Sequence, residues 1–385
     1  MGVMSFSIPR EIYYGENSLQ KLAELKGTKA ALVTGGSSMK KFGFLDKAAA
    51  ILKEGGIESI IIDGVEPNPS VKTVLRGAKA MQEFEPDWIV AIGGGSALDA
   101  AKVMWCFYEH PDLKFEDIIE VGSMPALRNK ARFIAIPSTS GTASEITAFS
   151  VITDTENHIK YPIVAGDMVP DIAILDPALP MKMPPHITAN TGMDVMCHAL
   201  EALASNASTH FTEPYAVRAI ELVSKYLPIA YKEGDNLEAR ECMHEASALA
   251  GMAFTNASLG LVHSLAHKIG GEFGVTHGLA NAILLPYIID FNRQFTDKYD
   301  YIEKVLEVED VAQVVRYLNV KLNIPICFKD CTEVDFNEDK FKEVLDRMSK
   351  NAFADPCTLT NPGTPTVDDV KMIYTSAFYG TPIKK

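Results

Sequence analysis

The distribution of hydrophobic positions divides the chain into two parts. In the first part, short apolar runs rich in β-branched residues alternate with segments of helical periodicity. Such runs predict buried strands, and their alternation with helices predicts βαβ units, that is, a largely parallel sheet with helices on both faces. The predicted strands are residues 30–34, 59–63, 88–92, 133–136 and 172–175.

The second part begins after Met183-Pro184-Pro185 and has almost no strand-like runs. Long segments rich in Ala, Leu, Glu and Met follow, and their apolar spacing predicts helices, for example over 213–226, 236–254 and 334–350. We therefore expect an α/β domain over residues 1–183 and an all-helical domain over 184–385. A cleft between two such domains is a common ligand site.

Length and composition agree with a soluble two-domain protein. At roughly 150 residues per domain, 385 residues allow two domains with cores of their own. The formal net charge of -14 argues against nucleic acid or an anionic membrane as partner, because both attract basic surfaces. The six cysteines form no CxxC pair, and we find no signal peptide and no membrane-spanning stretch. A cytoplasmic location is expected.

The first chemical signal follows the third predicted strand, at Gly93-Gly94-Gly95-Ser96. We expect Ser96 to cap a helix, with Asp99 completing a capping box. Glycines allow a ligand to approach the backbone, and a helix N-terminus offers free N–H groups, so the loop is a candidate pyrophosphate cradle. A tight strand-to-helix turn explains the same residues, and the run differs from the GxGxxG fingerprint.

A second loop follows the fourth predicted strand and is rich in hydroxyl groups. Serines and threonines surround Gly141, at positions 138, 139, 140, 142 and 144. Beside a glycine loop they would suit ribose and phosphate oxygens. A solvated turn is the alternative.

The loop after the first predicted strand, Gly35-Gly36-Ser37-Ser38, bears on the choice of dinucleotide. NAD sites commonly hold the adenosine ribose with a carboxylate near a strand end, and this loop has none. If the loop meets the ribose, NADP is favoured over NAD, and Gly35→Asp should shift the preference toward NADH. An ordinary turn is the alternative.

A polar stripe interrupts an apolar helical segment at residues 191–201. Asp194 and His198 are four positions apart and Glu201 is three further, so the three side chains fall within about 60° of one another around a helix. A buried stripe of this kind needs a partner charge. A pair of the D-x-x-x-H type is also often a simple helix ion pair.

Three of the nine histidines lie close together further along the chain. His263 and His267 are four apart, a helix end is predicted at Gly270-Gly271, and His277 follows. With Asp194 and His198, these imidazoles match a site for Fe(II) or Zn(II). We expect Glu201 to support such a site rather than bind the metal, and the remaining histidines to be surface or core residues, at positions 110, 158, 186, 210 and 244.

These motifs resemble, in content and order, those of the iron-containing (group III) alcohol dehydrogenase family. The resemblance covers nearly the whole chain and extends in particular to NADPH-dependent butanol dehydrogenases and to the alcohol dehydrogenase half of bifunctional aldehyde-alcohol dehydrogenases. The matching motifs are Phe6-x-x-Pro9-x-x-Ile12-x-x-Gly15, GGGSxxDxAK at 93–102, PSTSGTxSE at 137–145, Gly192-x-Asp194-x-x-x-His198-Ala-x-Glu201, and His263-x-x-x-His267-x-x-Gly270 with His277-Gly278-x-x-Asn281.

The resemblance implies a fold, ligands and cofactor contacts. It implies a Rossmann-like dinucleotide-binding domain before the all-helical metal-binding domain, in a homodimer. It implies metal ligands at Asp194, His198, His263 and His277, with His267 nearby as a candidate for proton transfer. It implies cofactor contacts at Asn68, Gly94, Gly95, Ser96, Thr139, Thr142 and Lys160, and NADP use from the glycine-rich loop of Gly35, Gly36 and Ser37.

The expected function is hydride transfer between NADP(H) and a small primary alcohol or aldehyde, such as butanol or butanal. A divalent Fe(II), or Zn(II), would act as Lewis acid. Alternatives are a zinc-dependent polyol dehydrogenase of the glycerol type, a dehydroquinate-synthase-like lyase, for which residues 186–281 lack a basic cluster, and a binding module that retains the site. No cysteine has an obvious activating setting, which disfavours a thiol-dependent aldehyde dehydrogenase.

The sequence departs from the family pattern at two positions. Thr276 stands where proline commonly precedes the last histidine, and Gly363 stands where arginine is common. Neither is a ligand position. Gly363 bears on the mouth of the substrate pocket near residues 355–357, and therefore on substrate choice.

Overall fold

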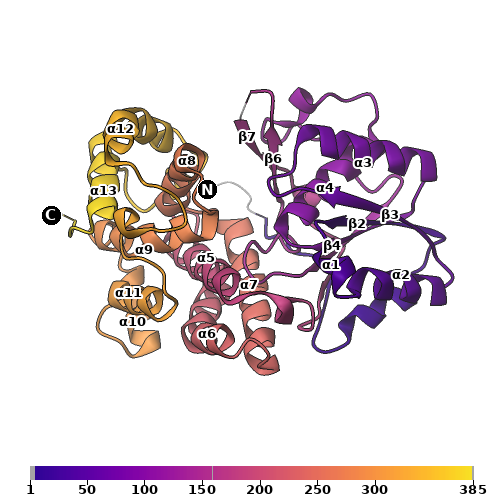
Figure 1. Ribbon diagram of the computed structural model, residues 1–385, viewed down its shortest axis with the longest axis horizontal. Helices are drawn as coiled ribbons and strands as arrows, with labels where there is room; N and C mark the ends of the chain where they lie inside the picture. The colour runs from indigo at the N-terminus through magenta and orange to yellow at the C-terminus, as the bar shows by residue number, and fades with distance from the viewer. Residues whose placement is uncertain (1–4, 158, 384–385) are drawn as a thin grey trace. The chain divides into compact units, whose positions relative to one another are not determined.

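The computed structural model describes residues 5–157 and 159–383. Contacts between Cα atoms divide the chain into two compact units, Met1–Lys182 and Met183–Lys385. The strands belong to the first unit, and the long helices from α5 onward belong to the second (Figure 1). The dinucleotide and metal-binding roles expected for the two parts stay predictions. His158 lies outside the described residues.

Within the described residues, six strands form one parallel sheet. In spatial order they are β1 (Glu11–Tyr14), β8 (Ile172–Leu175), β5 (Arg132–Pro137), β4 (Trp88–Gly93), β2 (Lys29–Gly35) and β3 (Glu58–Val65). The five predicted strands and the parallel sheet are confirmed. The edge strand β1 was not predicted, because its four residues are short of a hydrophobic run and partly exposed.

Strands β6 (Phe149–Asp154) and β7 (Ile159–Val164) form an antiparallel pair apart from the main sheet. Neither strand was predicted. They carry charged and polar residues, and their inward positions, such as Ile152 and Ile163, are too few to form an apolar run.

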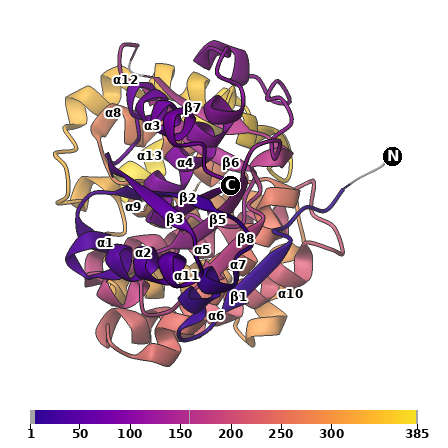
Figure 2. The same cartoon turned by 90° about the vertical axis from the view of Figure 1, so that its right-hand side faces the viewer.

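Helices cover both faces of the parallel sheet, as predicted. Alternate strand residues point to opposite faces. Leu32 and Val90 pack on one face with α1 (Ser38–Lys41) and α2 (Phe44–Glu54). Val33 and Ala91 pack on the other with α3 (Val71–Phe84) and α4 (Gly95–Glu109). Figure 2 shows the two pairs of helices on either side of the strands.

The predicted cap of α4 is wrong. The helix begins at Gly95 with Gly94 at the N-cap position, and no side chain caps it. Asp99 turns away from the helix end, where it accepts hydrogen bonds from Ser144 Oγ at 2.6 Å and from Val151 N at 3.0 Å. These partners lie some fifty positions further along the chain, so a local pattern could not reveal them.

One turn further along α4, a buried lysine binds the same region. Lys102 is fully buried, and its Nζ donates to the carbonyl oxygens of Thr147 at 2.6 Å and Phe149 at 2.9 Å. Glu145 is also buried nearby. Burial raises the pKa of Glu145 to about 7 and lowers the pKa of Lys102 to about 8. Asp99 and Lys102 thus tie α4 to residues 144–151.

The second unit is built from helices. They are α5 (Pro185–Ala204), α6 (Glu213–Lys232), α7 (Leu237–Ala257), α8 (Leu261–Phe273), α9 (His277–Asn292), α10 (Lys298–Leu306), α11 (Val311–Lys321), α12 (Glu338–Phe353) and α13 (Val367–Tyr379). Short 3-10 turns complete the chain: η1 (Ser18–Glu24), η2 (Phe115–Ile118), η3 (Gly166–Met168), η4 (Pro180–Lys182), η5 (Phe328–Asp330) and η6 (Pro356–Thr360).

The predicted helices exist, but several bounds differ. The segment predicted from 334 begins at Glu338, because the side chain of Asn337 caps that helix by accepting from Lys340 N. Helix α8 does not end at Gly270-Gly271. It continues to Phe273 and ends at Gly274, whose φ of 77° is the left-handed conformation typical of a helix C-terminus.

Among the described residues, no helix combines the length and the hydropathy needed to cross a membrane.

The buried carboxyl group of Glu145 generates a prediction for stability against pH. Its pKa of about 7 in the folded chain exceeds the ordinary value of 4.5, so the folded state keeps a proton that the unfolded state releases in this window. Raising the pH from about 5 to about 7 should therefore destabilise the wild type relative to Glu145→Gln, by at most roughly 1.4 kcal/mol per pH unit.

Urea denaturation of the wild type and the variant at both pH values measures this difference. Glu156→Gln, on the exposed turn between β6 and β7, is the control carboxylate. A gap between wild type and Glu145→Gln that stays constant over this pH range would mean that Glu145 does not titrate there.

Candidate functional site

The carboxyl ends of three adjacent strands gather the predicted nucleotide loops. Strand β2 lies between β3 and β4, so the chain moves outward in one direction after β2 and in the other from β4 on. Such a switch point, at the carboxyl ends of parallel strands, is the usual ligand position in open α/β sheets. The strand ends are tied together by a hydrogen bond that Thr34 Oγ1 donates to Ile92 O at 2.8 Å.

The glycine loop and the hydroxyl loop lie against each other. A Cβ atom on Gly94 would lie 3.6 Å from Thr139 Cγ2, and one on Gly95 would lie 2.8 Å from both Cγ2 and Oγ1 of Thr142. Only glycine therefore fits at position 95 without a shift. The structure brings these four predicted contact residues together at the start of α4, and Ser96 lies in its first turn, partly exposed.

The loop after β2 is exposed at Gly36 and Ser37, and Gly36 has a φ of 53°. Gly35 is constrained in a different way. A Cβ atom there would lie 2.9 Å from the backbone oxygen of Val65, so any side chain requires the backbone to move. The Gly35→Asp substitution suggested by the sequence is thus a poor test of cofactor choice, and Ser37 is the better position.

Asn68 and Lys160, predicted from distant segments, form a hydrogen-bonded pair. Lys160 Nζ donates to Asn68 Oδ1 at 2.8 Å. Asn68 adopts a left-handed conformation with φ 54°, and Thr153 N donates to Pro69 O at 2.8 Å, which fixes the β6–β7 hairpin to this turn. Burial lowers the pKa of Lys160. The pair therefore presents one amide and one cation beside the loop before α3.

In the second unit, the predicted metal ligands converge from three helices. Asp194 and His198 lie on α5, His263 on α8, and His277 at the start of α9. Asp194 Oδ1 lies 3.8 Å from His263 Nε2, 3.7 Å from His277 Nε2 and 4.0 Å from His198 Nε2. Two atoms that each lie about 2.1 Å from one ion are separated by roughly 3.4–3.6 Å. Donor atoms of Asp194, His263 and His277 also lie within 4.8 Å of one another, so these three have nearly the dimensions that a divalent metal requires, while His198 stands beside this group.

Burial keeps His263 in the protonation state that metal binding needs. Asp194, His198 and His263 are buried, whereas the side chain of His277 is 43% exposed. Burial, and then the neighbouring imidazoles, hold the pKa of His263 well below its ordinary value. A neutral imidazole has a free electron pair on one nitrogen, which is the form that binds a metal.

Glu201 orients His263 from the far side of the ring. Its Oε2 lies 2.5 Å from His263 Nδ1, and its Oε1 accepts from Val262 N at 2.6 Å. Burial raises the pKa of Glu201 to about 8, and the positive charge of a metal bound to His263 would favour the ionised carboxylate. A metal on Nε2 requires the proton of His263 to stay on Nδ1, and a carboxylate there holds it in place. This contact fits the supporting role expected for Glu201.

Asn281, one turn after His277 on α9, was not predicted as a site residue. Its Nδ2 donates to Asp194 Oδ1 at 2.7 Å and lies 3.0 Å from His277 Nε2. Its Oδ1 is buried and has no hydrogen-bond partner among residues 5–157 and 159–383. The four-residue spacing from His277 is the sequence signal that could have found it.

His267 lies beside the cluster rather than within the buried donor set. Its ring stacks on that of His277, with centroids 5.6 Å apart, and its side chain is 35% exposed. Its Nδ1 lies 3.1 Å from Asp355 Oδ2. Asp355 was not predicted as a site residue, because its partner is 88 positions away.

The two departures from the family pattern pack in different ways. Thr276 precedes α9, and its N and Oγ1 both donate to the carboxylate of Glu333. Gly363 has a φ of 75°, and a Cβ atom there would lie 2.4 Å from the ring of Phe295. The chain therefore leaves no room for an arginine side chain at this position without moving Phe295.

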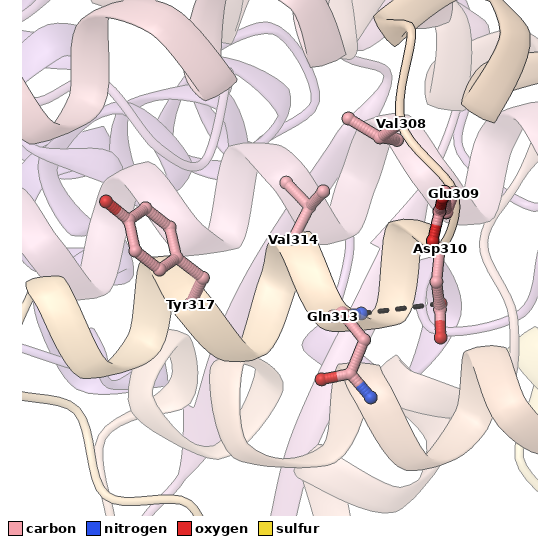
Figure 3. Close-up of a pocket in the computed structure, with 6 residues that line it drawn as sticks. All are labelled: Val308, Glu309, Asp310, Gln313, Val314 and Tyr317. Atoms are coloured by element: carbon pink, nitrogen blue, oxygen red, sulfur yellow. Dashed lines mark hydrogen bonds between the residues drawn. The ribbon is translucent and has the colours of Figure 1, made fainter.

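A separate depression on the second unit does not have the residues expected of a nucleotide site or a metal site. It has a volume of about 480 Å³ at the start of α11 and is lined by Val308, Glu309, Asp310, Gln313, Val314 and Tyr317 (Figure 3). The carboxylate of Asp310 is already used, because it accepts from Ala312 N and Gln313 N as the cap of α11. We do not assign a function to this depression.

Family models match nearly the whole chain. The model described as iron-containing alcohol dehydrogenase matches residues 9–177, and the one described as Fe-containing alcohol dehydrogenase family, C-terminal, matches residues 188–378. The chain therefore belongs to the iron-containing alcohol dehydrogenase family and is an oxidoreductase of that class. This confirms the resemblance that the motifs indicated.

Individual relatives give a finer comparison. The chain is 50% identical over 391 residues to the NADPH-dependent butanol dehydrogenase of Clostridium saccharobutylicum, covering 99% of this chain and 100% of the relative. It is 38% identical to the aldehyde-alcohol dehydrogenase of Streptococcus pneumoniae, over 97% of this chain and 46% of that longer protein. These matches do not favour the polyol dehydrogenase or the lyase considered above.

Solved structures of the family share the fold. The iron-containing alcohol dehydrogenase from Thermococcus thioreducens has a TM-score of 0.90 at 36% identity, over 98% of this chain and 100% of that one. A 1,3-propanediol oxidoreductase has a TM-score of 0.91 at 33% identity with the same coverage.

The contact between Glu201 and His263 predicts a loss of metal affinity when the carboxylate is removed. Glu201→Ala frees the ring of His263 to rotate, and we expect the affinity for Fe(II) to fall by about 10- to 100-fold. Anaerobic metal titration measures the affinity, and far-ultraviolet circular dichroism reports the helices. Glu343→Ala, an exposed carboxylate on α12, is the matched control. Unchanged affinity in Glu201→Ala would contradict the supporting role.

Proposed function

We propose that this chain catalyses the reversible reduction of small aldehydes to primary alcohols, with NADPH as hydride donor and iron as the metal. The observation that carries the proposal is the grouping of Asp194, His263 and His277, with His198 beside them, in which each imidazole Nε2 lies 3.7–4.0 Å from Asp194 Oδ1. The match of this chain to the family model described as iron-containing alcohol dehydrogenase supports the same proposal.

In this proposal the four side chains hold the metal, and Glu201 fixes the orientation of His263. The bound ion supplies a Lewis acid for the substrate oxygen, on which negative charge grows as hydride arrives at the carbonyl carbon. One carboxylate and three imidazoles suit both Fe(II) and Zn(II) by chemistry alone. We choose iron because the matching family models name it.

The nucleotide is assigned to the carboxyl edge of the parallel sheet. Gly94 and Gly95 let the pyrophosphate approach the N-terminus of α4, where free N–H groups face it. Ser96, Thr139 and Thr142 offer hydroxyl groups beside it, and Asn68 with Lys160 offers a further amide and a cation. Each of these contacts is a proposal, supported by the way the loops meet.

NADP(H) is preferred to NAD(H) in this proposal for two reasons. The loop of Gly35, Gly36 and Ser37 has no carboxylate to repel a 2′-phosphate or to bind a 2′-hydroxyl group. The relative that is 50% identical is described as NADPH-dependent. Its description as a butanol dehydrogenase also supports a short aliphatic substrate such as butanal. The homodimer and the cytoplasmic location stay predictions.

His263→Ala tests the metal site and the reaction together. Removing one ligand should abolish most bound iron and nearly all NADPH consumption with butanal, while the helical content stays close to that of the wild type. The assay uses protein reconstituted anaerobically with Fe(II), and iron content is measured in parallel. His186→Ala, an exposed histidine in the first turn of α5, is the control. Full iron and full turnover in His263→Ala would refute the site.

Ser37→Asp tests the cofactor preference. A carboxylate at this exposed position should repel the 2′-phosphate of NADPH and accept a hydrogen bond from the ribose of NADH, so the ratio of kcat/KM for NADPH to that for NADH should fall by about 10-fold or more. Ser123→Asp, an exposed position before β5, controls for the added charge. An unchanged ratio would mean that this loop does not meet the ribose.

A further inference from the structure

The segment from Asp355 to Asn361 binds the helix that carries two of the site histidines. Thr358 Oγ1 donates to Ser264 Oγ at 2.8 Å, and Asn361 Oδ1 accepts from Leu261 N at 3.2 Å. The segment thus contacts α8 at its first residue and one turn along. It is itself held as the short helix η6, which Asp355 caps by accepting from Cys357 N. Asp355 is therefore a rigidly held side chain.

The carboxylate of Asp355 reaches α8 at His267. Its Oδ2 lies 3.1 Å from His267 Nδ1 and 2.8 Å from Lys268 Nζ. Asp355 is buried, which alone would raise its pKa. The hydrogen bonds and charges of His267 and Lys268 outweigh burial and hold the pKa of Asp355 well below its usual range. Nδ1 of His267 therefore faces a charged acceptor.

A second metal site is the rival interpretation, since donor atoms of His267, Asp355 and Cys357 lie within 4.8 Å of one another. The contacts argue against it. Both carboxylate oxygens of Asp355 already accept hydrogen bonds, from Lys268, His267 and the backbone of Cys357. Burial and the nearby carboxylate raise the pKa of the Cys357 thiol well above its ordinary value, which leaves it protonated.

We propose that Asp355 is a positioning residue that fixes the tautomer of His267. A carboxylate acceptor keeps the proton of a neutral imidazole on Nδ1, so the electron pair stands on Nε2, at the opposite side of the ring. Asp355 does not touch the substrate. It acts only through His267.

This inference rests on the proposed function, in which His267 transfers the proton. Reduction of an aldehyde consumes one hydride from NADPH and one proton. His267 delivers the proton from Nε2 to the substrate oxygen and regains one from water, and the reverse reaction runs the same path backward. Asp355 stabilises the protonated imidazole before each delivery and holds the neutral ring that remains afterwards as the Nδ1–H tautomer.

Activity supplies the first test. We expect Asp355→Asn and Asp355→Ala each to lower kcat by about 10- to 100-fold while KM for NADPH and for butanal changes by less than about 2-fold and iron content stays the same. Thr358→Val removes a neighbouring hydrogen bond to α8 without touching His267, and it should leave kcat nearly unchanged. Asp355→Asn has the shape of the native side chain, which guards against misfolding.

A double-mutant cycle separates positioning from general structural support. In a His267→Ala background, adding Asp355→Asn should lower kcat no further, because the residue through which Asp355 acts is gone. If Asp355→Asn costs the same factor with and without His267, or costs nothing in the wild type, the proposal is overturned.

Nitrogen NMR of histidine-labelled protein supplies a test that does not depend on turnover. With diamagnetic Zn(II) as the probe metal, the His267 signals, assigned by their loss in His267→Ala, should show a protonated Nδ1 in the wild type and a mixture of tautomers in Asp355→Asn. The same tautomer in both proteins would overturn the proposal even if the chain has no aldehyde reductase activity. Absence of that activity in the wild type, with the tautomer shift present, would instead refute the proposed function.

Discussion

The helical unit is organised around one buried carboxylate. Asp194 lies on α5 with only 3% of its surface exposed, and a buried charge is costly unless it is paired or bound to a metal. Its neighbours come from helices far apart in sequence: His263 from α8, and His277 and Asn281 from α9. Because three helices must meet at one oxygen atom, the packing of these helices also determines the geometry of the site.

In the α/β unit, segments far apart in sequence are brought together by the close approach of backbone rather than by a shared charge. A parallel sheet leaves its carboxyl edge lined by loops, and the loops after β4 and β5 can meet only if position 95 has no side chain. The helix that starts there is fixed at two further points, since Asp99 binds Ser144 and Lys102 binds Thr147 and Phe149. Burying the charge of Lys102 is costly for stability, but the contacts of Asp99 and Lys102 hold residues 144–149 against α4.

Features with a local cause were predictable from the sequence, and features with a distant partner were not. The five strands form from uninterrupted apolar runs, and the four-residue spacings placed Asp194 beside His198 and His263 beside His267. The supposed cap at Ser96 and Asp99 failed because Asp99 has partners near residue 150 that compete with the helix end. Asp355 was missed as a partner of His267 for the same reason. Gly270 and Gly271 were read as a helix end, but packing carries α8 past them to Gly274.

One residue shows why the spacing between the motifs matters as much as the motifs. Glu201 accepts from Val262 N with one oxygen and contacts His263 Nδ1 with the other, so it both completes the start of α8 and orients a proposed ligand. A Cβ atom on Gly260 would lie 3.0 Å from Glu201 Oε1 and 3.1 Å from Asn361 Oδ1. A side chain at 260 would therefore push apart two groups that belong to segments 160 positions from each other in the chain. Position 260 therefore needs glycine because Glu201 and Asn361 approach it closely, and not because the turn before α8 is tight.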